Sequence, residues 1–411
     1  MAPHRVVVTG LGAISPIGQS ARDFFVALVA ARSGIRLVNP ADSPPGRMLV
    51  AGQIDFDQSA LWPPHQAAQF DRATQFALAA TRQAMDDASL ALGEEASLRA
   101  GVYWGTGLGG AASIEGSYRS LFAGNGRVRP TSVVLGMNNA AAGQISIMHG
   151  LRGPLLNVST ACSSSASAIG EAFRAVRAGY ADVIIAGGSE ALITLGNLAA
   201  WDAMRALAQP DATDPACSCK PFSIDRTGLV LGEGAAALVI ESAEHAAKRG
   251  AAVYAELVGY GNAADANHIS KPDSAGQVRA IRAALAEAQL TPADVDYVNA
   301  HGTATEVGDV VETMAIKEVF GARGAAPWIS STKALHGHLM GATGALEVTA
   351  AIMAMHQGVI PPTAHLDRPD PQCDLDYVPN EARQKHVNTV MSNSFGFGGM
   401  NAVIIARRYS A

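Results

Sequence analysis

The chain contains few charged residues. Only 16% of its 411 residues are Asp, Glu, Lys or Arg, and 48% are hydrophobic, whereas an average globular protein is roughly 25% charged. A chain this rich in apolar residues must bury a large core, which excludes intrinsic disorder. Its 36 acidic residues outnumber 30 basic ones, for a net charge of −6. Because nucleic-acid binders normally carry a basic domain or stripe, this balance argues against a nucleic-acid partner.

Cysteines and long apolar runs are also scarce. The four cysteines, Cys162, Cys217, Cys219 and Cys373, are too few for a disulfide framework in a chain of this length. The longest apolar stretches, such as 183–187 and 235–240, fall far short of the ~18 residues that a transmembrane helix needs. The N-terminal segment has no signal-peptide pattern. We therefore expect a soluble, cytoplasmic protein with mostly free thiols and no membrane span.

Short β-branched runs alternate with Ala-rich stretches along the chain. In the first part we expect strands at 5–9, 102–104, 181–186 and 235–240, and helices at 21–31 and 163–178. The pattern restarts near residue 250, with strands at 254–260, 296–300, 389–393 and 402–406 and helices at 274–288, 310–320 and 344–357. This alternation predicts a layered α/β fold. The restart predicts two similar halves, residues 1–250 and 251–411.

Cys162 is the cysteine that most suggests chemistry. It lies in the small-residue run Ser159-Thr-Ala-Cys-Ser-Ser-Ser-Ala-Ser-Ala168, directly before an Ala-rich helix pattern. The positive end of a helix dipole lowers the pKa of a thiol there and favours the thiolate, so Cys162 is a candidate nucleophile. A buried, inert side chain is nevertheless the commoner fate of a lone cysteine.

Three further segments carry polar groups at expected turns. His301 follows a predicted strand, at the end where open α/β sheets bind ligands. Residues 330–344 hold Lys333, His336 and His338 among small residues, and the Gly-rich loop 392–401 offers backbone amides for an oxyanion. A metal site built from these histidines and Cys162 is a weaker alternative, because the ligand spacing is wide and no Cys-x-x-Cys pair exists.

Four motifs occur together in a fixed order. They are Thr160-Ala-Cys-Ser-Ser, Asn299-Ala-His-Gly-Thr-Ala-Thr, Ser331-Thr-Lys-x-x-x-Gly-His and Asn393-Ser-Phe-Gly-Phe-Gly-Gly. In order and spacing the chain resembles the elongating β-ketoacyl-[acyl carrier protein] synthases, with the closer similarity to the type II (KAS II) branch. The resemblance runs from Val6 to the C-terminal loop. It implies a thiolase-like α/β fold, with two pseudo-duplicated halves in a five-layer αβαβα arrangement, and a dimer.

The resemblance also implies catalytic roles. Cys162 would take the acyl chain from an acyl carrier protein thioester. His301 and His338 would decarboxylate the malonyl carrier and stabilise the enolate. Lys333 would order the histidines electrostatically, and Glu347 would support this network.

Substrate positions follow from the same resemblance. The N–H groups of Cys162 and Phe397 would form an oxyanion hole, and Phe397 would gate the acyl pocket. Thr303 and Thr305 would bind the phosphopantetheine arm. The remaining expected positions are Leu108, Ser270 and Phe395 in the substrate pocket and Arg127, Arg129 and Arg205 at the carrier-docking surface. No metal or organic cofactor is required, since the substrates are carried on phosphopantetheine.

The chain departs from the family pattern at several places. Met400 replaces the Thr usual after Gly-Gly, and Leu108 keeps the pocket floor bulky. Thr131-Ser132 stands where many members carry aromatics that cross the dimer. The segment 63–71 lacks the basic cluster that grips the carrier in many members. This last difference leads to the hypothesis of a dedicated carrier.

Other features are expected to be bystanders. Gly105-Thr-Gly-Leu-Gly-Gly110 matches the dinucleotide pattern, but neither the following helix nor the ribose-binding acid is evident, so we interpret it as a turn near the acyl pocket. We expect His336 to be a surface or supporting group, His268 to be structural, and Cys217 and Cys219 to be uninvolved.

The predicted activity is decarboxylative condensation of an acyl group with malonyl carrier, giving 3-oxoacyl carrier, CO₂ and free carrier. A degradative thiolase would need a second cysteine in 392–401, which contains none. A non-catalytic chain-length subunit would lack the nucleophile, and an initiating synthase would use Cys-His-Asn. The alternative kept open is a dedicated ketosynthase of a specialised lipid or polyketide pathway, acting as a homodimer or with a related partner subunit.

Overall fold

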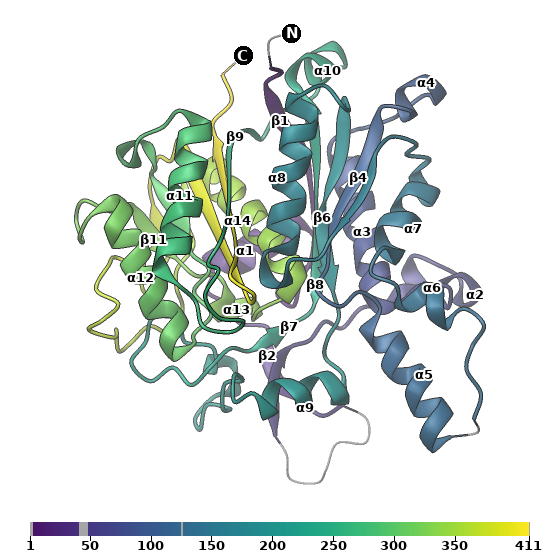
Figure 1. Cartoon of the computed structure of the whole chain (residues 1–411), viewed down its shortest axis with the longest axis horizontal. Coiled ribbons are helices and arrows are strands. Elements are labelled where there is room, and N and C mark those ends of the chain that lie inside the picture. Colours follow the sequence, from purple (N-terminus) through teal and green to yellow (C-terminus); the bar gives the residue numbers. More distant parts are fainter. Residues whose placement is uncertain (1–2, 41–47, 125, 411) are drawn as a thin grey trace.

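The computed structural model describes residues 3–40, 48–124 and 126–410. Its central element is one mixed sheet of ten strands. The strands lie in the order β11-β10-β14-β15-β9-β1-β8-β6-β4-β5 (Figure 1). The first five in sequence are β1 (Val6–Ile14), β4 (Ala100–Gly105), β5 (Leu155–Val158), β6 (Val183–Glu190) and β8 (Gly234–Ser242). The others are β9 (Ala255–Ala264), β10 (Tyr297–Asn299), β11 (Trp328–Ser330), β14 (Thr389–Gly396) and β15 (Met400–Arg407).

The two halves of this sheet repeat one topology. In the first half, β4 lies parallel to β5 and β6, and β6, β8 and β1 follow antiparallel. In the second half, β10 lies parallel to β11 and β14, and β14, β15 and β9 follow antiparallel. β1 and β9 pair from Val6↔Leu257 to Val8↔Ala255 and join the halves. The predicted pseudo-duplication is therefore present in the strand order itself.

The helices complete five layers. α3 (Arg72–Asp87) and α7 (Ala140–His149) cover the outer face of the first half, and α11 (Ser274–Ala288) and α12 (Glu306–Phe320) cover that of the second (Figure 1). α8 (Ser164–Arg177) and α14 (Thr343–Gln357) pack between the two halves. Every residue of α14 from Thr343 to Met355 is buried, as expected of a helix with apolar or small residues on all sides. The predicted five-layer thiolase-like arrangement is confirmed.

Close packing of the central helices depends on small residues. A Cβ placed on Gly344 would lie 2.8 Å from both the amide and the Cβ of Ala166, so α14 approaches α8 this closely only with glycine there. The N-termini of both helices thereby meet in the middle of the molecule, beside the polar residues that the motifs contribute.

Shorter elements fill the edges. The helices are α1 (Ala21–Val29), α2 (Pro64–Ala67), α4 (Glu94–Ser97), α5 (Ala111–Ala123), α6 (Ser132–Gly136), α9 (Leu195–Ala203), α10 (Ala243–Lys248) and α13 (Lys333–His336). The 3-10 turns are η1 (Gln58–Ala60), η2 (Ala161–Ser163), η3 (Pro215–Cys217), η4 (Pro292–Asp294) and η5 (Met340–Ala342). The small sheets are β2 (Ile35–Val38), β3 (Leu49–Gly52) and β7 (Leu231–Gly232), and β12 (Val359–Ile360) with β13 (Arg383–Gln384). None of the helices within the described residues is long and apolar enough to cross a membrane.

Candidate active site

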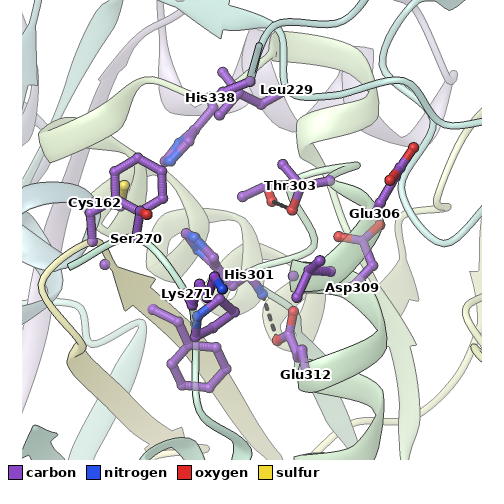
Figure 2. A pocket seen from close by; sticks show the side chains of 18 of the residues that line it. Cys162, Leu229, Ser270, Lys271, His301, Thr303, Glu306, Asp309, Glu312 and His338 are labelled. Atoms are coloured by element: carbon purple, nitrogen blue, oxygen red, sulfur yellow. Dashed lines mark hydrogen bonds between the residues drawn. The ribbon is translucent and has the colours of Figure 1, made fainter. Parts of the chain in front are cut away.

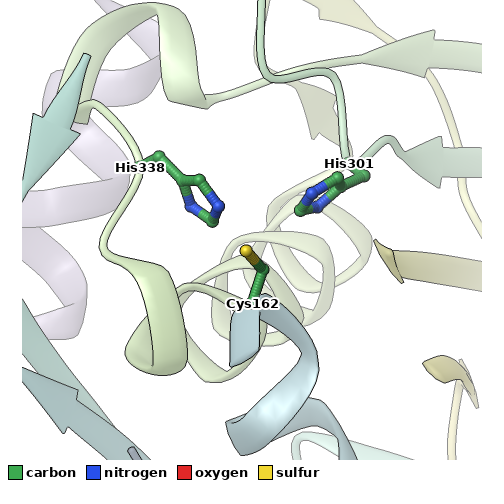
Figure 3. Close-up of side chains that lie close together, drawn as sticks. All are labelled: Cys162, His301 and His338. Carbon is green, nitrogen blue, oxygen red and sulfur yellow. The ribbon is translucent and has the colours of Figure 1, made fainter. Parts of the chain in front are cut away.

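Cys162, His301 and His338 converge from three separate elements (Figure 3). Cys162 lies in η2 just before α8, His301 follows β10, and His338 lies between α13 and η5. One ligand atom from each side chain lies within 4.8 Å of the other two. The imidazole ring centroids are 5.3 Å apart at an interplanar angle of 84°. The structure thus brings together the three residues that the sequence singled out.

The thiol of Cys162 is protonated in the free protein. The side chain is buried, and burial raises its pKa to about 11, although the backbone amides of Phe397 and Cys162 and the charge of Lys333 oppose this. Burial therefore opposes the effect by which a helix N-terminus favours a thiolate. The preceding residue, Ala161, has a φ of 51°, in the left-handed region that a side chain disfavours. This conformation sets the sharp turn that points Cys162 toward the histidines.

Both imidazoles are neutral. Burial lowers the pKa of His301 and of His338 well below the ordinary value, and the nearby charge of Lys333 lowers both further. The Nδ1 of His338 lies 2.8 Å from the hydroxyl of Thr343, and its Nε2 has no hydrogen-bond partner among the described residues. Because Nδ1 is paired with Thr343, Nε2 is the ring nitrogen left free to form a hydrogen bond with a bound group.

Lys333 and Glu347 form a buried ion pair behind His301. The Nζ of Lys333 lies 2.5 Å from a carboxylate oxygen of Glu347 and donates to the carbonyl of His301, and both side chains of the pair are inaccessible to solvent. The same Nζ lies 3.4 Å from Nδ1 of His301. Burial raises the pKa of Glu347, and the charge of Lys333 opposes this rise. Through Lys333, the pair contacts both the backbone carbonyl and the Nδ1 atom of His301.

Glu312 holds the same loop from the other side, and it was not among the residues expected from the sequence. Its two carboxylate oxygens accept from the amides of His301, at 2.8 Å, and Gly302, at 2.7 Å. A signal was present in the sequence. Glu306, Asp309 and Glu312 recur every third residue, which puts acidic side chains on one face of a helix whose neighbouring positions are apolar.

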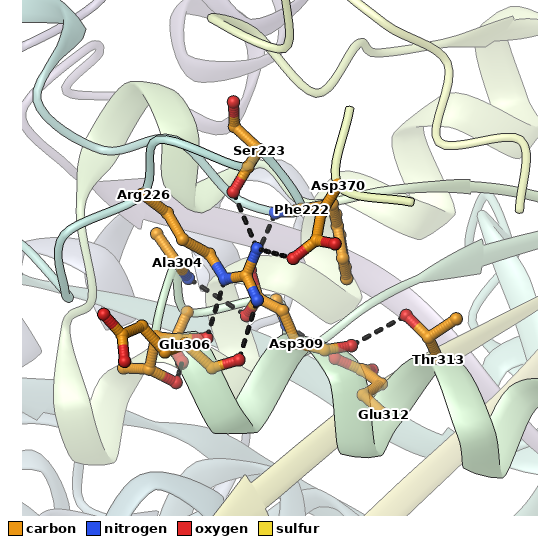
Figure 4. Close-up of polar contacts among 12 residues, drawn as sticks. Phe222, Ser223, Arg226, Ala304, Glu306, Asp309, Glu312, Thr313 and Asp370 are labelled. Atoms are coloured by element: carbon orange, nitrogen blue, oxygen red, sulfur yellow. Dashed lines mark hydrogen bonds and ion pairs between the residues drawn. The ribbon is translucent and has the colours of Figure 1, made fainter. Parts of the chain in front are cut away.

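A second polar network, centred on Arg226, fixes the segment after His301 (Figure 4). The buried guanidinium donates to the carbonyls of Ser223, Thr305 and Glu306 and lies 2.6 Å from a carboxylate oxygen of Asp370. Asp309 accepts from the amides of Phe222 and Ala304 at 2.7 and 3.1 Å. The sequence alone does not distinguish Arg226, because all its partners except Ser223 lie about 80 or 144 residues away.

A cavity of about 420 Å³ leads from this centre to the surface (Figure 2). The predicted residues Thr303, Thr305, Ser270, Phe395 and Phe397 all line it, and the hydroxyls of Thr303 and Thr305 lie 3.0 Å apart. At its mouth Trp201 of α9 stacks on Phe397, with ring centroids 5.7 Å apart. The cavity therefore connects Cys162 with side chains at the surface.

Leu108 does not line this cavity, and its expected place in the substrate pocket stays a prediction. Its side chain is about half exposed and lines a separate open groove of about 480 Å³ with Ile114, Tyr118 and Phe122 of α5. The physical reason is that the amides of Gly107 and Leu108 donate to the buried Glu190, which turns the Leu108 side chain toward α5. The same contact bears on residues 105–110, the loop that matches the dinucleotide-binding pattern. A helix, α5, does follow it, but the loop's amides are occupied by a carboxylate and cannot hold a pyrophosphate.

His336 and Cys219 are both buried. Of the two alternatives expected for His336, burial excludes the surface and leaves a supporting group, with its ring nitrogens 3.0 Å from the Thr332 hydroxyl and 2.7 Å from the Gly337 carbonyl. Cys219 does not line the cavity, and its expected lack of involvement stays a prediction. Of the expected docking residues, Arg205 lies at the cavity mouth, whereas Arg127 and Arg129 lie on the exposed segment between α5 and α6.

A thiol, two imidazoles and paired amides lie together at the join of two thiolase-like halves, as expected of a condensing enzyme. Residues 4–246 match the family described as β-ketoacyl synthase, N-terminal domain, and residues 254–367 match its C-terminal domain. The chain belongs to the β-ketoacyl synthase family.

Relatives cover the whole chain. It is 43% identical over 411 residues to a 3-oxoacyl-[acyl-carrier-protein] synthase 2 of Staphylococcus aureus, covering 99% of each chain. It is 40% identical to the same-named protein of Coxiella burnetii, again over 99% of each. A β-ketoacyl synthase from Burkholderia phymatum matches with a TM-score of 0.91 and 36% identity over 99% of this chain and 100% of that one. A type II PKS acyl-carrier protein in complex with its ketosynthase matches with a TM-score of 0.90 and 31% identity, over 99% and 100%.

Proposed function

We propose that the protein condenses an acyl group with a malonyl group, both carried on acyl carrier protein, to give 3-oxoacyl carrier, CO₂ and free carrier. The observation that carries this proposal is the meeting of Cys162, His301 and His338 within 4.8 Å at the foot of a cavity. The reaction is an acyltransfer followed by carbon–carbon bond formation, and each half uses groups already described.

The first half-reaction loads Cys162. The sulfur attacks the thioester carbonyl of the acyl carrier. The oxyanion that forms accepts hydrogen bonds from the amides of Cys162 and Phe397, which already face the sulfur. Collapse of the tetrahedral intermediate breaks the carrier C–S bond, and the thiol proton of Cys162 is transferred to the departing carrier sulfur. The acyl group then remains on Cys162.

The second half-reaction extends the chain. The bond between the malonyl Cα and its carboxylate breaks, CO₂ leaves, and the electron pair moves into an enolate. The thioester oxygen of that enolate accepts from Nε2 of His338 and from His301, since both rings are neutral donors in a buried site. The enolate carbon attacks the acyl-Cys162 carbonyl, and the cysteine sulfur leaves and is protonated.

The cavity mouth supports docking of an acidic carrier. Arg205 and Lys271 are exposed on either side of it, next to the exposed apolar side chains Met204, Ile269 and Val307. Thr303 and Thr305 offer hydroxyls to the amides of the pantetheine arm. Arg127 and Arg129 add a second basic position. A dedicated carrier remains the hypothesis drawn from 63–71, which has no Lys or Arg. Equal turnover with a housekeeping carrier and a pathway carrier would contradict it.

A second copy of the chain is the proposed partner at the far edge of the sheet. β5 is the edge strand there, and large apolar side chains are exposed along it and the adjoining helices, namely Phe122, Val133, Val134, Ile147, Leu155 and Leu156. An unpaired edge flanked by apolar residues is typical of an interface. A related subunit could occupy this face in a heterodimer.

The division near residue 250 separates the proposed roles, with the nucleophile in the first half and both histidines in the second. A cytoplasmic location is proposed as well, because the four cysteines are unpaired, as is usual in that compartment.

The test of the function is intact-mass analysis after mixing the protein with acyl carrier thioesters of different chain length. We expect a mass gain equal to one acyl group, lost in Cys162→Ala. His338→Ala should still acylate but should not release CO₂ from malonyl carrier. Acylation of Cys162→Ala, or no acylation by any carrier, would contradict the proposal.

A further inference from the structure

Glu190 is a fully buried carboxylate that the chemistry above does not use. It is the last residue of β6, and four donors surround it. One oxygen accepts from the Thr106 hydroxyl and the Leu108 amide, both at 3.1 Å. The other accepts from the amides of Gly107, at 2.6 Å, and Gly341, at 3.0 Å. Among the described residues no Lys or Arg forms an ion pair with it. Such a costly buried group persists only where its hydrogen bonds offset the lost hydration.

The donors belong to two segments that border the reacting groups. Gly341 lies in η5, three residues after His338, and its neighbour Met340 packs in the same apolar cluster as Cys162. On the other side, the carbonyl of Gly107 accepts from the hydroxyl of Ser159 at 3.2 Å, and Ser159 lies three residues before Cys162. Glu190 is therefore the shared anchor of a segment leading away from His338 and a segment packed before Cys162.

The backbone around the carboxylate is shaped for this contact. A Cβ on Gly341 would lie 2.4 Å from the Gly107 amide and 2.7 Å from a Glu190 oxygen. A Cβ on Gly107 would lie 2.8 Å from the same oxygen. The two segments can approach one another and share one carboxylate oxygen only because both positions are glycine.

The internal repeat of the fold points to the same role. β4 in the first half corresponds to β10 in the second, and their last residues take equivalent places, Gly105 beside Gly188 of β6 and Asn299 beside Ser392 of β14. Two and three residues further on, the paired amides are those of Gly107 and Leu108 in one half and His301 and Gly302 in the other. Glu190 binds the first pair as Glu312 binds the second. The second pair belongs to a catalytic histidine.

We propose that Glu190 is a positioning residue for condensation, which sets the separation of His338 and Cys162 by tying Gly341 to Gly107. The proposal rests on the condensing activity proposed above. Glu190 touches no substrate, so it acts on the geometry of the transition state rather than on binding of the carrier. Small displacements of reacting groups cost up to about 10²-fold in rate.

The experiment compares Glu190→Gln with Glu241→Gln. Glu241 is equally buried and lies on β8 at the opposite end of its pairing with β6, beside Val183, with Arg249 and His245 as partners. It is therefore a matched control for loss of a buried charge in the same sheet. Gly341→Ala is the second variant, because its methyl group forces the anchor apart while keeping the carboxylate. Steady-state kinetics with acyl and malonyl carriers and thermal unfolding are measured for all four proteins.

We expect kcat of Glu190→Gln and of Gly341→Ala to fall about 10- to 100-fold, with KM for malonyl carrier within about two-fold of the wild type. Glu241→Gln should lower the unfolding temperature but keep kcat within about two-fold. If kcat of Glu190→Gln and Gly341→Ala stays at the wild-type value, or falls no more than in an equally destabilised Glu241→Gln, the proposal is wrong. A wild type that fails to condense would overturn the proposed function, and this inference with it.

Discussion

At the scale of single residues, burial decides the charge of each reacting group. It keeps a proton on the thiol of Cys162 and keeps the rings of His301 and His338 neutral. In the proposed reaction the thiol must therefore give up its proton during attack. Behind the site, Lys333 and its partner Glu347 place opposite charges together. The pair contacts His301 without adding a net charge beside its ring.

Removing Lys333 is expected to destabilise the fold strongly. Lys333→Ala would leave the Glu347 carboxylate buried without its partner, which costs about 3–5 kcal/mol in the free energy of unfolding. Lys317→Ala is the control, because its ion pair with Asp374 lies at 2.7 Å but is 38% and 50% exposed. Its loss should cost less than about 1 kcal/mol. Urea unfolding measures both, and equal effects would contradict the ranking.

His336 is expected to make stability depend on acid. Burial lowers the pKa of this histidine to about 3, so the unfolded chain binds a proton below about pH 6.5 while the folded chain does not. Stability therefore falls as pH drops from 7 to 5, and His336 contributes about 2 kcal/mol to that fall. The free energy of unfolding is measured at pH 7 and at pH 5 for His336→Gln and for the wild type. Its decrease between the two pH values should be about 2 kcal/mol smaller in His336→Gln than in the wild type. An identical pH dependence would show that His336 titrates normally in the folded protein.

At the scale of elements, the loop between β14 and β15 joins the chemistry to the cavity mouth. It presents the amide of Phe397 to Cys162 and the ring of Phe397 to Trp201. Gly398 and Gly399 have φ values of 81° and 71°, so the reversal needs residues without side chains. The amide of Gly398 donates to the carbonyl of Ile269, which connects this loop to the neighbouring wall of the cavity.

Gly399→Ala is expected to slow acylation. The new Cβ would lie 2.6 Å from that of Asp265, and the backbone conformation is one that alanine disfavours. The loop must shift, which withdraws the Phe397 amide, and loss of one oxyanion donor costs about 10²–10³ in rate. Single-turnover acylation of Cys162 measures the effect.

Gly116→Ala provides the matched control. Gly116 lies exposed within α5, and a Cβ added there would meet no neighbouring atom within 4 Å. This change should therefore stabilise the helix by about 0.5–1 kcal/mol and leave acylation intact. If Gly399→Ala acylates as fast as this control, the loop has no share in stabilising the oxyanion.

The elements also show what sequence patterns can and cannot predict. The predicted helix 274–288 coincides with α11, and the predicted strands of both halves fall on observed ones. The strand predicted at 181–186 instead extends to Glu190, because Gly187 and Gly188 have little β-propensity of their own and are held by pairing with β8. The prediction thereby stopped short of Glu190. No helix was predicted at α3, α5 or α7.

The same limit applies to predicting the residues of the site from the sequence. Residues with reactive side chains inside short motifs, such as Cys162 and His301, were identifiable because their chemistry and their neighbours in sequence agree. Glu190 and Arg226 bind backbone groups that lie about 80 residues away in sequence. Their partners are set by tertiary packing, which the local pattern does not encode.

At the scale of the whole molecule, neither half contains a complete site. Cys162 comes from the first half and His301 and His338 from the second, and the central helices α8 and α14 meet where these residues lie. The two outer edges of the ten-stranded sheet, β5 and β11, are also unlike one another. β5 carries exposed Leu155 and Leu156, at 45% and 41%, and is the proposed contact with a second copy.

Leu156→Arg is expected to separate the copies. The change replaces an apolar contact with a cation on each copy, and like charges at a symmetric interface repel. We expect the variant to have a mass near the 42.3 kDa of one chain and the wild type to have twice that mass. Ile224→Arg is the control, since Ile224 is 51% exposed but lies in the loop after Phe222, away from β5. Sedimentation equilibrium measures both. A wild type of one chain's mass would contradict the proposed dimer.

β15 has a consequence for synthesis of the protein. It follows the other nine strands in sequence, yet it lies between β14 and β9 in the sheet. Until about residue 407 leaves the ribosome, β9 and β14 each present an unpaired edge, and the Phe397 amide is not in place. At about 5–20 residues per second, translation has already released the Cys162 segment well over ten seconds earlier. A nascent chain therefore carries its nucleophile long before it can use it, with two open strand edges that chaperones must keep from pairing with other chains.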